Sequence, residues 1–364
     1  MRGFDDTFQG KPNLITNPEA LDEFISNLSG NDRIALDTEA DSLHCYFEKL
    51  CLIQISLPGL DALVDPLAGF SLDPLYQALK DKELILQGAD FDLRLLRRAG
   101  GMEAGRVFDT MIAARLTGKT EFSLAALVST YFGVTLAKSS QKENWAKRPL
   151  TQKMIDYARN DTRFLLPLAE KLEVELRDLG RWEWFQQSCA KAVQSAGITR
   201  QRDTENQWRI TGSVDFRGRA AALLRALWTW RDEEARTVDR PPFHILRNEE
   251  LLEATHLFDT GKPVRIHHLS PTRSKRFFAA AEKALALPQD EWPVFVHKTR
   301  VRPTPEEEMR FKALKKKRDD TAAQLKLDPS LIAPKATLEA LACDLNLAEE
   351  KLLPWQQEIL LPVQ

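Results

Sequence analysis

The strand-like segments of this sequence all lie in its first quarter, and this uneven distribution constrains the fold more than any other feature. Runs rich in apolar and β-branched residues predict strands at 33–39, 50–56, 62–65 and 84–87. Amphipathic patterns between and beside them predict helices at 19–29, 73–81 and 90–99. Strands that alternate with helices are typical of a layered α/β domain. We therefore expect an α/β domain at the start of the chain.

From about residue 109 onward, nearly every segment has a helical pattern. The segment 151–179 follows Pro149, has the period of an amphipathic helix and ends before Gly180. Pro167 lies inside this segment and removes a backbone donor, so we expect a kink or a break there. The sequence thus predicts a long helical region after the α/β domain.

The length of 364 residues exceeds what one hydrophobic core usually organises, so we expect several domains. Residues 200–217 are polar and poorly periodic, and 291–304 are rich in proline, which is typical of linkers. We predict domains over 1–199, 218–290 and 305–364. The two C-terminal domains share a long helix followed by a proline-containing turn and smaller helices, as diverged repeats would.

Composition excludes several classes of protein. No stretch approaches the roughly 18 to 20 continuous apolar residues of a membrane span, and the N-terminus lacks the pattern of a secretory signal. Four scattered cysteines show neither zinc-ligand spacing nor a disulfide framework. We expect a cytoplasmic protein with reduced cysteines and no membrane partner.

Charge is distributed unevenly, although the whole chain has a net charge of only −2. The net charge is −5 over residues 1–199, +5 over 200–302 and −2 over 303–364. An acidic region beside a basic one fits an enzyme with carboxylates at its reaction centre and a separate surface for a polyanion. Chance variation of surface charge is the alternative, and the sequence alone leaves it open.

Asp37 and Glu39 stand two residues apart on the first predicted strand. Their side chains therefore point to one face, while Leu36 and Thr38 point to the other. Two carboxylates on one face of an apolar strand raise each other's pKa, and a divalent cation removes that penalty. The alternative is an exposed strand end with ordinary solvated acids.

Two further acidic positions follow. Asp92, with Asp90, lies where a predicted buried strand leads into a helix, so either one could instead cap that helix. Tyr157 and Asp161 are four residues apart, which places them on one face of a helix. Each pattern alone is common, but their order and elements allow all of them to meet at one point of an α/β domain.

These motifs resemble the DEDD exonuclease superfamily, in the subclass with a tyrosine in the third motif, and within it the ribonuclease D family. The resemblance rests on Leu36–Glu39, Lys49–Ser56, Lys138–Leu150 and Tyr157–Asp161, and it covers about residues 13–364. The sequence departs from the family pattern at Gln87, where many relatives have a histidine.

The resemblance implies an α/β ribonuclease H-like exonuclease domain, with a mixed sheet flanked by helices, followed by two all-α HRDC-like helical domains. It implies a 3′-to-5′ exoribonuclease that acts on RNA with a free 3′ end, such as tRNA precursors, and releases 5′-nucleoside monophosphates. Two divalent cations, Mg²⁺ or Mn²⁺, would be the cofactors.

In the arrangement that the resemblance implies, Asp37 bridges both ions, Glu39 and Asp161 help to hold the ion on the side of the nucleophile, and Asp92 contributes to the other. Tyr157 would orient the attacking water rather than take its proton, because a phenol has an ordinary pKa of about 10.

Basic residues in two regions are candidates for RNA contacts. The first group precedes the third motif and is interleaved with an aromatic residue: Lys138, Lys142, Trp145, Lys147 and Arg148. The second group lies in the basic middle region: Arg217, Arg219, Arg225, Arg231, Lys262, Arg265, Arg273, Lys275 and Arg276. Alternatively, Trp145 is a core residue and the basic side chains near it are only solvated.

Two other functions use the same features. A DNA-directed exonuclease would need the same carboxylates, and the sequence does not show what reads a 2′-hydroxyl. A non-catalytic RNA-binding protein on this fold would be marked by loss of a carboxylate, whereas all four and the tyrosine are present.

Overall fold

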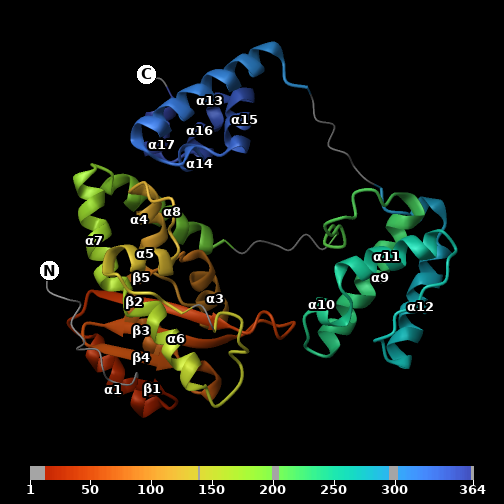
Figure 1. The fold of residues 1–364 in the computed structure, drawn as a ribbon, viewed down its shortest axis with the longest axis horizontal. Coiled ribbons are helices and arrows are strands. Elements are labelled where there is room, and N and C mark those ends of the chain that lie inside the picture. The colour runs from red at the N-terminus through yellow and green to blue at the C-terminus, as the bar shows by residue number, and fades with distance from the viewer. Residues whose placement is uncertain (1–12, 138–139, 199–204, 295–301, 362–364) are drawn as a thin grey trace. The chain divides into compact units, whose positions relative to one another are not determined.

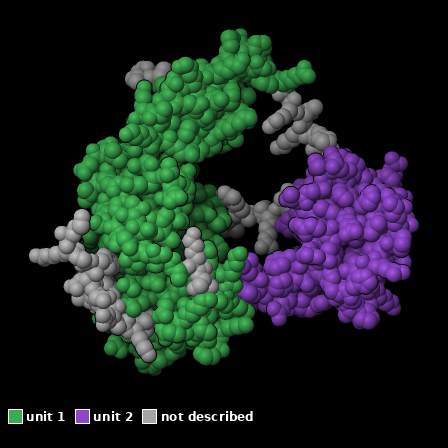
Figure 2. Space-filling view, viewed as in Figure 1, with its two compact units in different colours: residues 1–40, 50–199, 301–364 green, residues 41–49, 200–300 purple. Residues whose placement is uncertain are grey.

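The computed structural model describes residues 13–137, 140–198, 205–294 and 302–361 (Figure 1). The chain divides into two compact units, which Figure 2 shows in green and purple. The first unit comprises residues 1–40, 50–199 and 301–364, and the second comprises 41–49 and 200–300.

The first unit is built on a six-stranded mixed sheet with the order β1-β4-β3-β2-β5-β6. Its strands are β1 (Asn13–Ile15), β2 (Arg33–Ala40), β3 (Leu50–Leu57), β4 (Leu60–Val64), β5 (Glu83–Leu86) and β6 (Arg106–Asp109). β2 pairs antiparallel with β3 and parallel with β5. All eight residues of β3 are buried, as expected of a central strand rich in apolar residues. The expected mixed sheet is confirmed, and it has two additional strands, β1 and β6, of three and four residues.

Helices cover both faces of the sheet (Figure 1). Helices α1 (Pro18–Leu28), α2 (Asp73–Leu79) and α3 (Asp90–Gly100) pack with Ile34 and Leu36 of β2 in one core. Ala35 of β2 faces the opposite way, into a second core. The helices of this unit that remain before residue 200 are α4 (Thr110–Leu116), α5 (Leu124–Phe132), α6 (Gln152–Thr162), α7 (Leu165–Asp178) and α8 (Trp182–Ala196). Residues 33, 35, 37 and 39 therefore share the face opposite to α3.

The segment expected to kink or break near Pro167 forms two helices, α6 and α7. The break falls at Arg163 and Phe164, three residues before the proline. Pro167 thus lies in the first turn of α7, where the backbone N–H groups have no partner within the helix and proline is tolerated. Tyr157 and Asp161 both lie on α6, as expected.

The second unit is built from helices and their connecting turns, and it includes residues 41–49, which connect β2 to β3. Its helices are α9 (Gly218–Thr237), α10 (Pro242–Ile245), α11 (Asn248–Asp259) and α12 (Pro271–Leu285). Trp230 and Phe277 meet edge to face at its centre, with ring centroids 4.9 Å apart. Within this unit, the Tyr46 hydroxyl donates to Asp232 at 2.8 Å, and the Tyr46 backbone N–H donates to Asp239 at 3.0 Å. The connection between β2 and β3 is thus part of the helical unit.

The C-terminal helices belong to the first unit. They are α13 (Pro305–Leu325), α14 (Pro329–Ile332), α15 (Lys335–Cys343), α16 (Ala348–Lys351) and α17 (Pro354–Leu360). Trp355 stacks on Trp184 of α8, with centroids 4.9 Å apart and planes 14° from parallel. Buried Arg181 donates to the Leu116 and Leu325 carbonyls, at 2.7 Å each. The expected separation of 305–364 from the exonuclease domain is therefore not seen, and its likeness to an HRDC domain stays a prediction.

Of the helices in the described part of the chain, none combines the length and the apolar character that a bilayer crossing needs.

Candidate active site

Strand β2, helix α6 and helix α3 of the first unit bring the predicted acidic residues together. Asp37 and Glu39 lie on β2, and Asp161 lies near the end of α6, which packs against the same face of the sheet. One carboxylate oxygen from each of these residues lies within 4.8 Å of the others. All three side chains are half-buried. The alternative of an exposed strand end with solvated acids is therefore wrong.

Asp92 completes the acidic cluster from the other side of the sheet. It lies in the first turn of α3, is only 5% exposed, and accepts a hydrogen bond of 2.5 Å from the Thr38 hydroxyl. It does not cap α3, which has Ala89 at its N-cap without a side-chain capping bond. Since Thr38 points away from Asp37 and Glu39, the cluster is assembled around one strand and draws on both of its faces.

Burial raises the pKa of all four carboxyls, and neighbouring carboxylates of the cluster add to the effect at Asp37, Glu39 and Asp161. Burial and the neighbouring carboxylates raise the pKa of Glu39 to about 9 and that of Asp37 well above its usual range. Burial raises the pKa of Asp161 to about 7 and that of Asp92 to about 6. A divalent cation would supply the positive charge that these buried carboxylates need.

The donor set also fits a metal of a particular kind. All four side chains offer oxygen, the donor that hard divalent cations such as Mg²⁺ and Mn²⁺ prefer. Among the described residues, the group of possible metal ligands formed by Asp37, Glu39 and Asp161 contains no cysteine and no histidine. The acidic cluster is therefore suited to divalent cations of the oxygen-seeking type.

Tyr157 lies one turn before Asp161 on α6. Its hydroxyl forms a hydrogen bond with Asp161, which lowers the pKa of that carboxyl. Burial and the nearby carboxylates of Asp161, Glu39 and Asp37 raise the pKa of the phenol. Tyr157 therefore keeps its proton at neutral pH and can donate a hydrogen bond, whereas it cannot act as a base.

A buried polar network anchors α6 to the sheet. Arg159 forms a 2.6 Å ion pair with Asp61 of β4, in which both side chains are mostly buried. The Ser56 hydroxyl on β3 donates to Asp61 at 2.6 Å and lies 2.7 Å from the Thr162 hydroxyl. Arg159 and Thr162 flank Asp161, so this network fixes the carboxylate over the sheet. No local sequence pattern marks these four residues, because each residue type is common on its own.

Trp145 is not an RNA contact in this structure. Its side chain is only 1% exposed, and its ring lies 6.1 Å from that of Tyr157. The alternative that it is a core residue is confirmed. Trp145 instead packs near the ring of Tyr157 and helps to hold it in place.

Arg148 is an exposed residue, but its guanidinium is bonded to other groups of the protein and its side chain is 27% exposed. It donates to both oxygens of Asp65, at 2.5 and 2.6 Å, and to the carbonyls of Trp145, Lys147 and Cys51. These five bonds use all five N–H groups of a guanidinium. The prediction that Arg148 binds phosphate is therefore wrong. Lys142 and Lys147 are exposed, and Lys138 lies outside the described residues.

In the second unit, the predicted basic residues fall into three groups: buried, paired or bonded within the unit, and exposed. Arg231 is 5% exposed and donates to the Leu246 carbonyl and the Asn248 side chain, so the prediction that it binds RNA is wrong. Others are exposed or partly exposed but are paired or bonded within the unit: Arg219 with Asp259, Arg273 and Arg276 with buried Glu234, and Arg225 with the Glu291 carbonyl. Lys262, Arg265 and Lys275 are exposed, as is Arg217.

Asp109 and Gln87 organise the loop that leads to Asp92. Buried Asp109 accepts from the backbone N–H groups of Gly88 and Ala89, at 3.0 and 2.8 Å. The Gln87 side chain donates to the Phe122 carbonyl at 2.8 Å. The residue that departs from the family pattern thus has a structural partner outside the acidic cluster.

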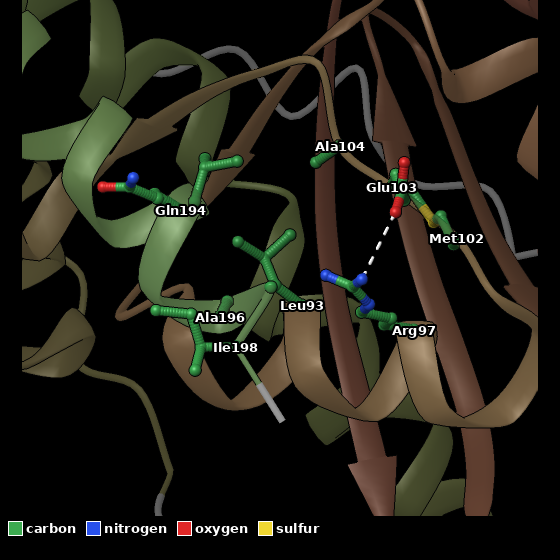
Figure 3. Close-up of a pocket in the computed structure, with 10 residues that line it drawn as sticks. Leu93, Arg97, Met102, Glu103, Ala104, Gln194, Ala196 and Ile198 are labelled. Carbon is green, nitrogen blue, oxygen red and sulfur yellow. Dashed lines mark ion pairs between the residues drawn. The ribbon is translucent and has the colours of Figure 1, made fainter. Parts of the chain in front are cut away.

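A separate pocket of about 380 Å³ lies where α3 meets α8. Leu93, Met102, Gln194 and Ile198 are among the residues that line it, and Arg97 pairs with Glu103 across 3.4 Å (Figure 3). None of the four clustered carboxylates lines this pocket. It reflects the packing of α3 against α8 and not the acidic site.

Comparison with known proteins identifies both parts of this architecture. The family model of the 3′-5′ exonuclease domain matches residues 12–177, and that of the HRDC domain matches residues 220–257. Ribonuclease D of Escherichia coli is 30% identical over 348 residues, which cover 90% of this chain and 89% of that protein. Ribonuclease D of Sphingobium indicum is 31% identical over 249 residues, which cover 67% of this chain and 64% of that protein. The chain thus matches just under two thirds of the length of this second relative.

The structural comparison agrees. A crystal structure of Escherichia coli RNase D, described as an exoribonuclease involved in structured RNA processing, has a TM-score of 0.68 and 27% identity to this chain. The match covers 96% of each chain.

The mixed sheet, its acidic cluster and the matched domain define a 3′-to-5′ exonuclease. The chain belongs to the ribonuclease D family, and it is an exoribonuclease that hydrolyses phosphodiester bonds.

Proposed function

We propose that this exoribonuclease trims the 3′ ends of structured RNA, tRNA precursors among them, by a two-metal mechanism. The observation that supports the proposal most strongly is the meeting of Asp37, Glu39 and Asp161 within 4.8 Å, with Asp92 held beside them by Thr38. Asp37 would take part in holding two cations, Mg²⁺ or Mn²⁺. Glu39 and Asp161 would hold one of them, and Asp92 would help to hold the other.

When bound, such cations activate a water molecule and neutralise the charge that develops on the departing 3′ oxygen. The protein's own residues set the geometry. The α6 anchor of Arg159, Asp61 and Thr162 keeps Asp161 in place. Tyr157, held by Trp145 and protonated at neutral pH, would donate a hydrogen bond that orients the attacking water. The product would be a 5′-nucleoside monophosphate.

The second unit would bind the body of the RNA. Its exposed basic residues Lys262, Arg265 and Lys275 offer charge to phosphates without a sequence requirement. Lys142 and Lys147 are exposed on the segment before α6 and are candidates for contacts near the 3′ end. A cytoplasmic location remains a prediction.

The test is incubation of the purified full chain with a 3′-extended tRNA and with single-stranded DNA, each with Mg²⁺, Mn²⁺ or a chelator. Release of 5′-nucleoside monophosphates is followed by chromatography, with RNA blocked by a 3′-phosphate as the control. We expect stepwise release from RNA with a free 3′ hydroxyl and none with the chelator. Equal rates on DNA would make the enzyme a general exonuclease, and activity in the chelator would refute the metal mechanism.

A further inference from the structure

Gln54 on β3 is a buried amide that no described residue satisfies. Its side chain is 0% exposed, and neither Nε2 nor Oε1 has a hydrogen-bond partner among the described residues. An unpaired amide at such a position is costly, since buried polar side chains are nearly always hydrogen-bonded. An exception of this kind often marks a functional role.

The position of Gln54 shows which group its side-chain amide can reach with a hydrogen bond. Gln54 is the direct partner of Asp37 in the antiparallel pairing of β2 and β3. Directly opposed residues have Cβ atoms about 4.5–5.5 Å apart and point to the same face. The amide of a glutamine can therefore reach the carboxylate of Asp37.

The other neighbours of Gln54 leave it no alternative on this face. Leu63, across the other strand pair, and Leu52, two residues earlier, are apolar. Ser56, two residues later, already uses its hydroxyl with Asp61 and Thr162. α6 packs over β3 with the small apolar Ala158. Of these immediate neighbours, Asp37 alone offers a side-chain acceptor with capacity left, because a carboxylate can accept several hydrogen bonds besides the one from the Thr38 backbone.

We propose that Gln54 is a positioning residue for Asp37: its side-chain N–H donates to the Asp37 carboxylate when the acidic cluster holds its cations. The inference rests on the proposed function, because it assigns Asp37 to the metal site. Carboxylates that bind metals are themselves held by hydrogen bonds, and loss of such a bond typically weakens metal affinity by roughly 10- to 100-fold. Gln54 thus contributes to metal affinity without touching a metal.

The experiment replaces Gln54 by methionine, which keeps the length of the side chain and removes the amide. Gln54→Leu is the second variant, and Leu52→Met, on the same strand and face, is the matched control. Each protein is titrated with Mn²⁺ by calorimetry, and its thermal unfolding is followed in the metal-free state. We expect Gln54→Met to weaken Mn²⁺ binding by roughly tenfold or more. We also expect its metal-free midpoint to rise by roughly 2 to 4 °C, because an unpaired buried amide is removed.

A purely structural role predicts the opposite pair of results. Mn²⁺ affinity within twofold of wild type in both Gln54 variants would overturn the inference. A metal-free midpoint that falls more than that of Leu52→Met would do the same, because it would show that the amide is already satisfied. Asp37→Asn in the same titration separates the two proposals. If wild type and Asp37→Asn bind Mn²⁺ with equal affinity, the proposed metal site is refuted. If Asp37→Asn loses Mn²⁺ affinity but the Gln54 variants do not, only the role of Gln54 is refuted.

Discussion

The Thr38 hydroxyl donates to the Asp92 carboxylate at 2.5 Å, although Thr38 points to the opposite face of β2 from Asp37 and Glu39. This bond lowers the pKa of Asp92, which burial raises to about 6. One threonine thereby keeps the most buried carboxylate of the cluster available to a cation.

Replacing Thr38 by valine should move the pH dependence of activity to higher pH. Without its donor, Asp92 holds its proton to a higher pH, and a protonated carboxyl binds metal poorly. We expect kcat/KM at pH 7 to fall by roughly tenfold and to recover partly by pH 8.5. Measurement from pH 6 to 9 at fixed Mg²⁺ checks this. Thr255→Val, at a buried threonine of the second unit, is the control, and an unshifted profile for Thr38→Val would contradict the expectation.

The metal-free protein should lose stability as the pH rises. The folded-state pKa values of Asp92, Asp161 and Glu39 are about 6, 7 and 9, all above their ordinary values near 4. The folded state therefore binds these protons more tightly than the unfolded state, and the stability this gives is lost as the pH rises through the folded-state values. Thermal unfolding in chelator from pH 5 to 9 should show this decline.

Mg²⁺ should reverse that decline at high pH, since the cation replaces the protons. Asp161→Asn should flatten the decline near pH 7. A metal-free midpoint that stays constant from pH 5 to 9 would show that the carboxylates do not repel one another as the structure indicates.

Asp37→Asn should abolish hydrolysis and leave the fold intact, because it removes an anionic ligand and keeps the shape. Loss of one ion from a two-ion site costs several kcal/mol of transition-state stabilisation, and about 1.4 kcal/mol already corresponds to tenfold. Activity above about a tenth of wild type would argue against a role in holding the cations. The metal-free midpoint should rise, because repulsion within the cluster falls. Asp156→Asn, at an exposed carboxylate on α6, is the control for the loss of one negative charge.

Tyr157→Phe should lower turnover by roughly 10²-fold with little change in RNA affinity, because the ring that packs on Trp145 remains and only the hydroxyl is lost. Single-turnover rates and RNA binding in Ca²⁺ separate the two quantities. Equal losses of binding and turnover would make Tyr157 a clamp for substrate.

Neutralising the exposed basic residues of the second unit should weaken binding of a tRNA precursor and flatten its salt dependence. The variant replaces three residues by alanine: Lys262, Arg265 and Lys275. Each phosphate contact that is lost should reduce the slope of log affinity against log salt by roughly 0.7 to 0.9. The control makes the same change on α13, at Lys312, Lys315 and Lys316. Equal slopes in the two variants would show that the second unit does not hold RNA through these residues.

The sequence predicted the active site better than it predicted the surfaces around it. Alternation along β2 and the spacing of Tyr157 and Asp161 follow from backbone geometry, so the residues that share a face could be identified before the fold was known. Thr38 was assigned correctly to the opposite face, but its bond to Asp92 depends on the packing of α3 across the sheet. Long-range packing of that kind leaves no local pattern.

The RNA-binding residues were harder to predict, because residue type does not determine burial. Trp145, Arg148 and Arg231 are of residue types common on nucleic-acid surfaces, yet Trp145 and Arg231 are buried, and the guanidinium of Arg148 is bonded to Asp65. The strands β1 and β6 were missed because three or four residues are too few to show alternation.

The stacking of Trp355 on Trp184 has a consequence for the order in which the molecule is completed during synthesis. Trp184 and most of the core behind it lie before residue 190, but the helix that carries Trp355 emerges from the ribosome about 170 residues later, which takes on the order of ten seconds. The helical unit over 200–300 is complete before then. The nascent enzyme thus has a folded second unit before the first unit has its full core.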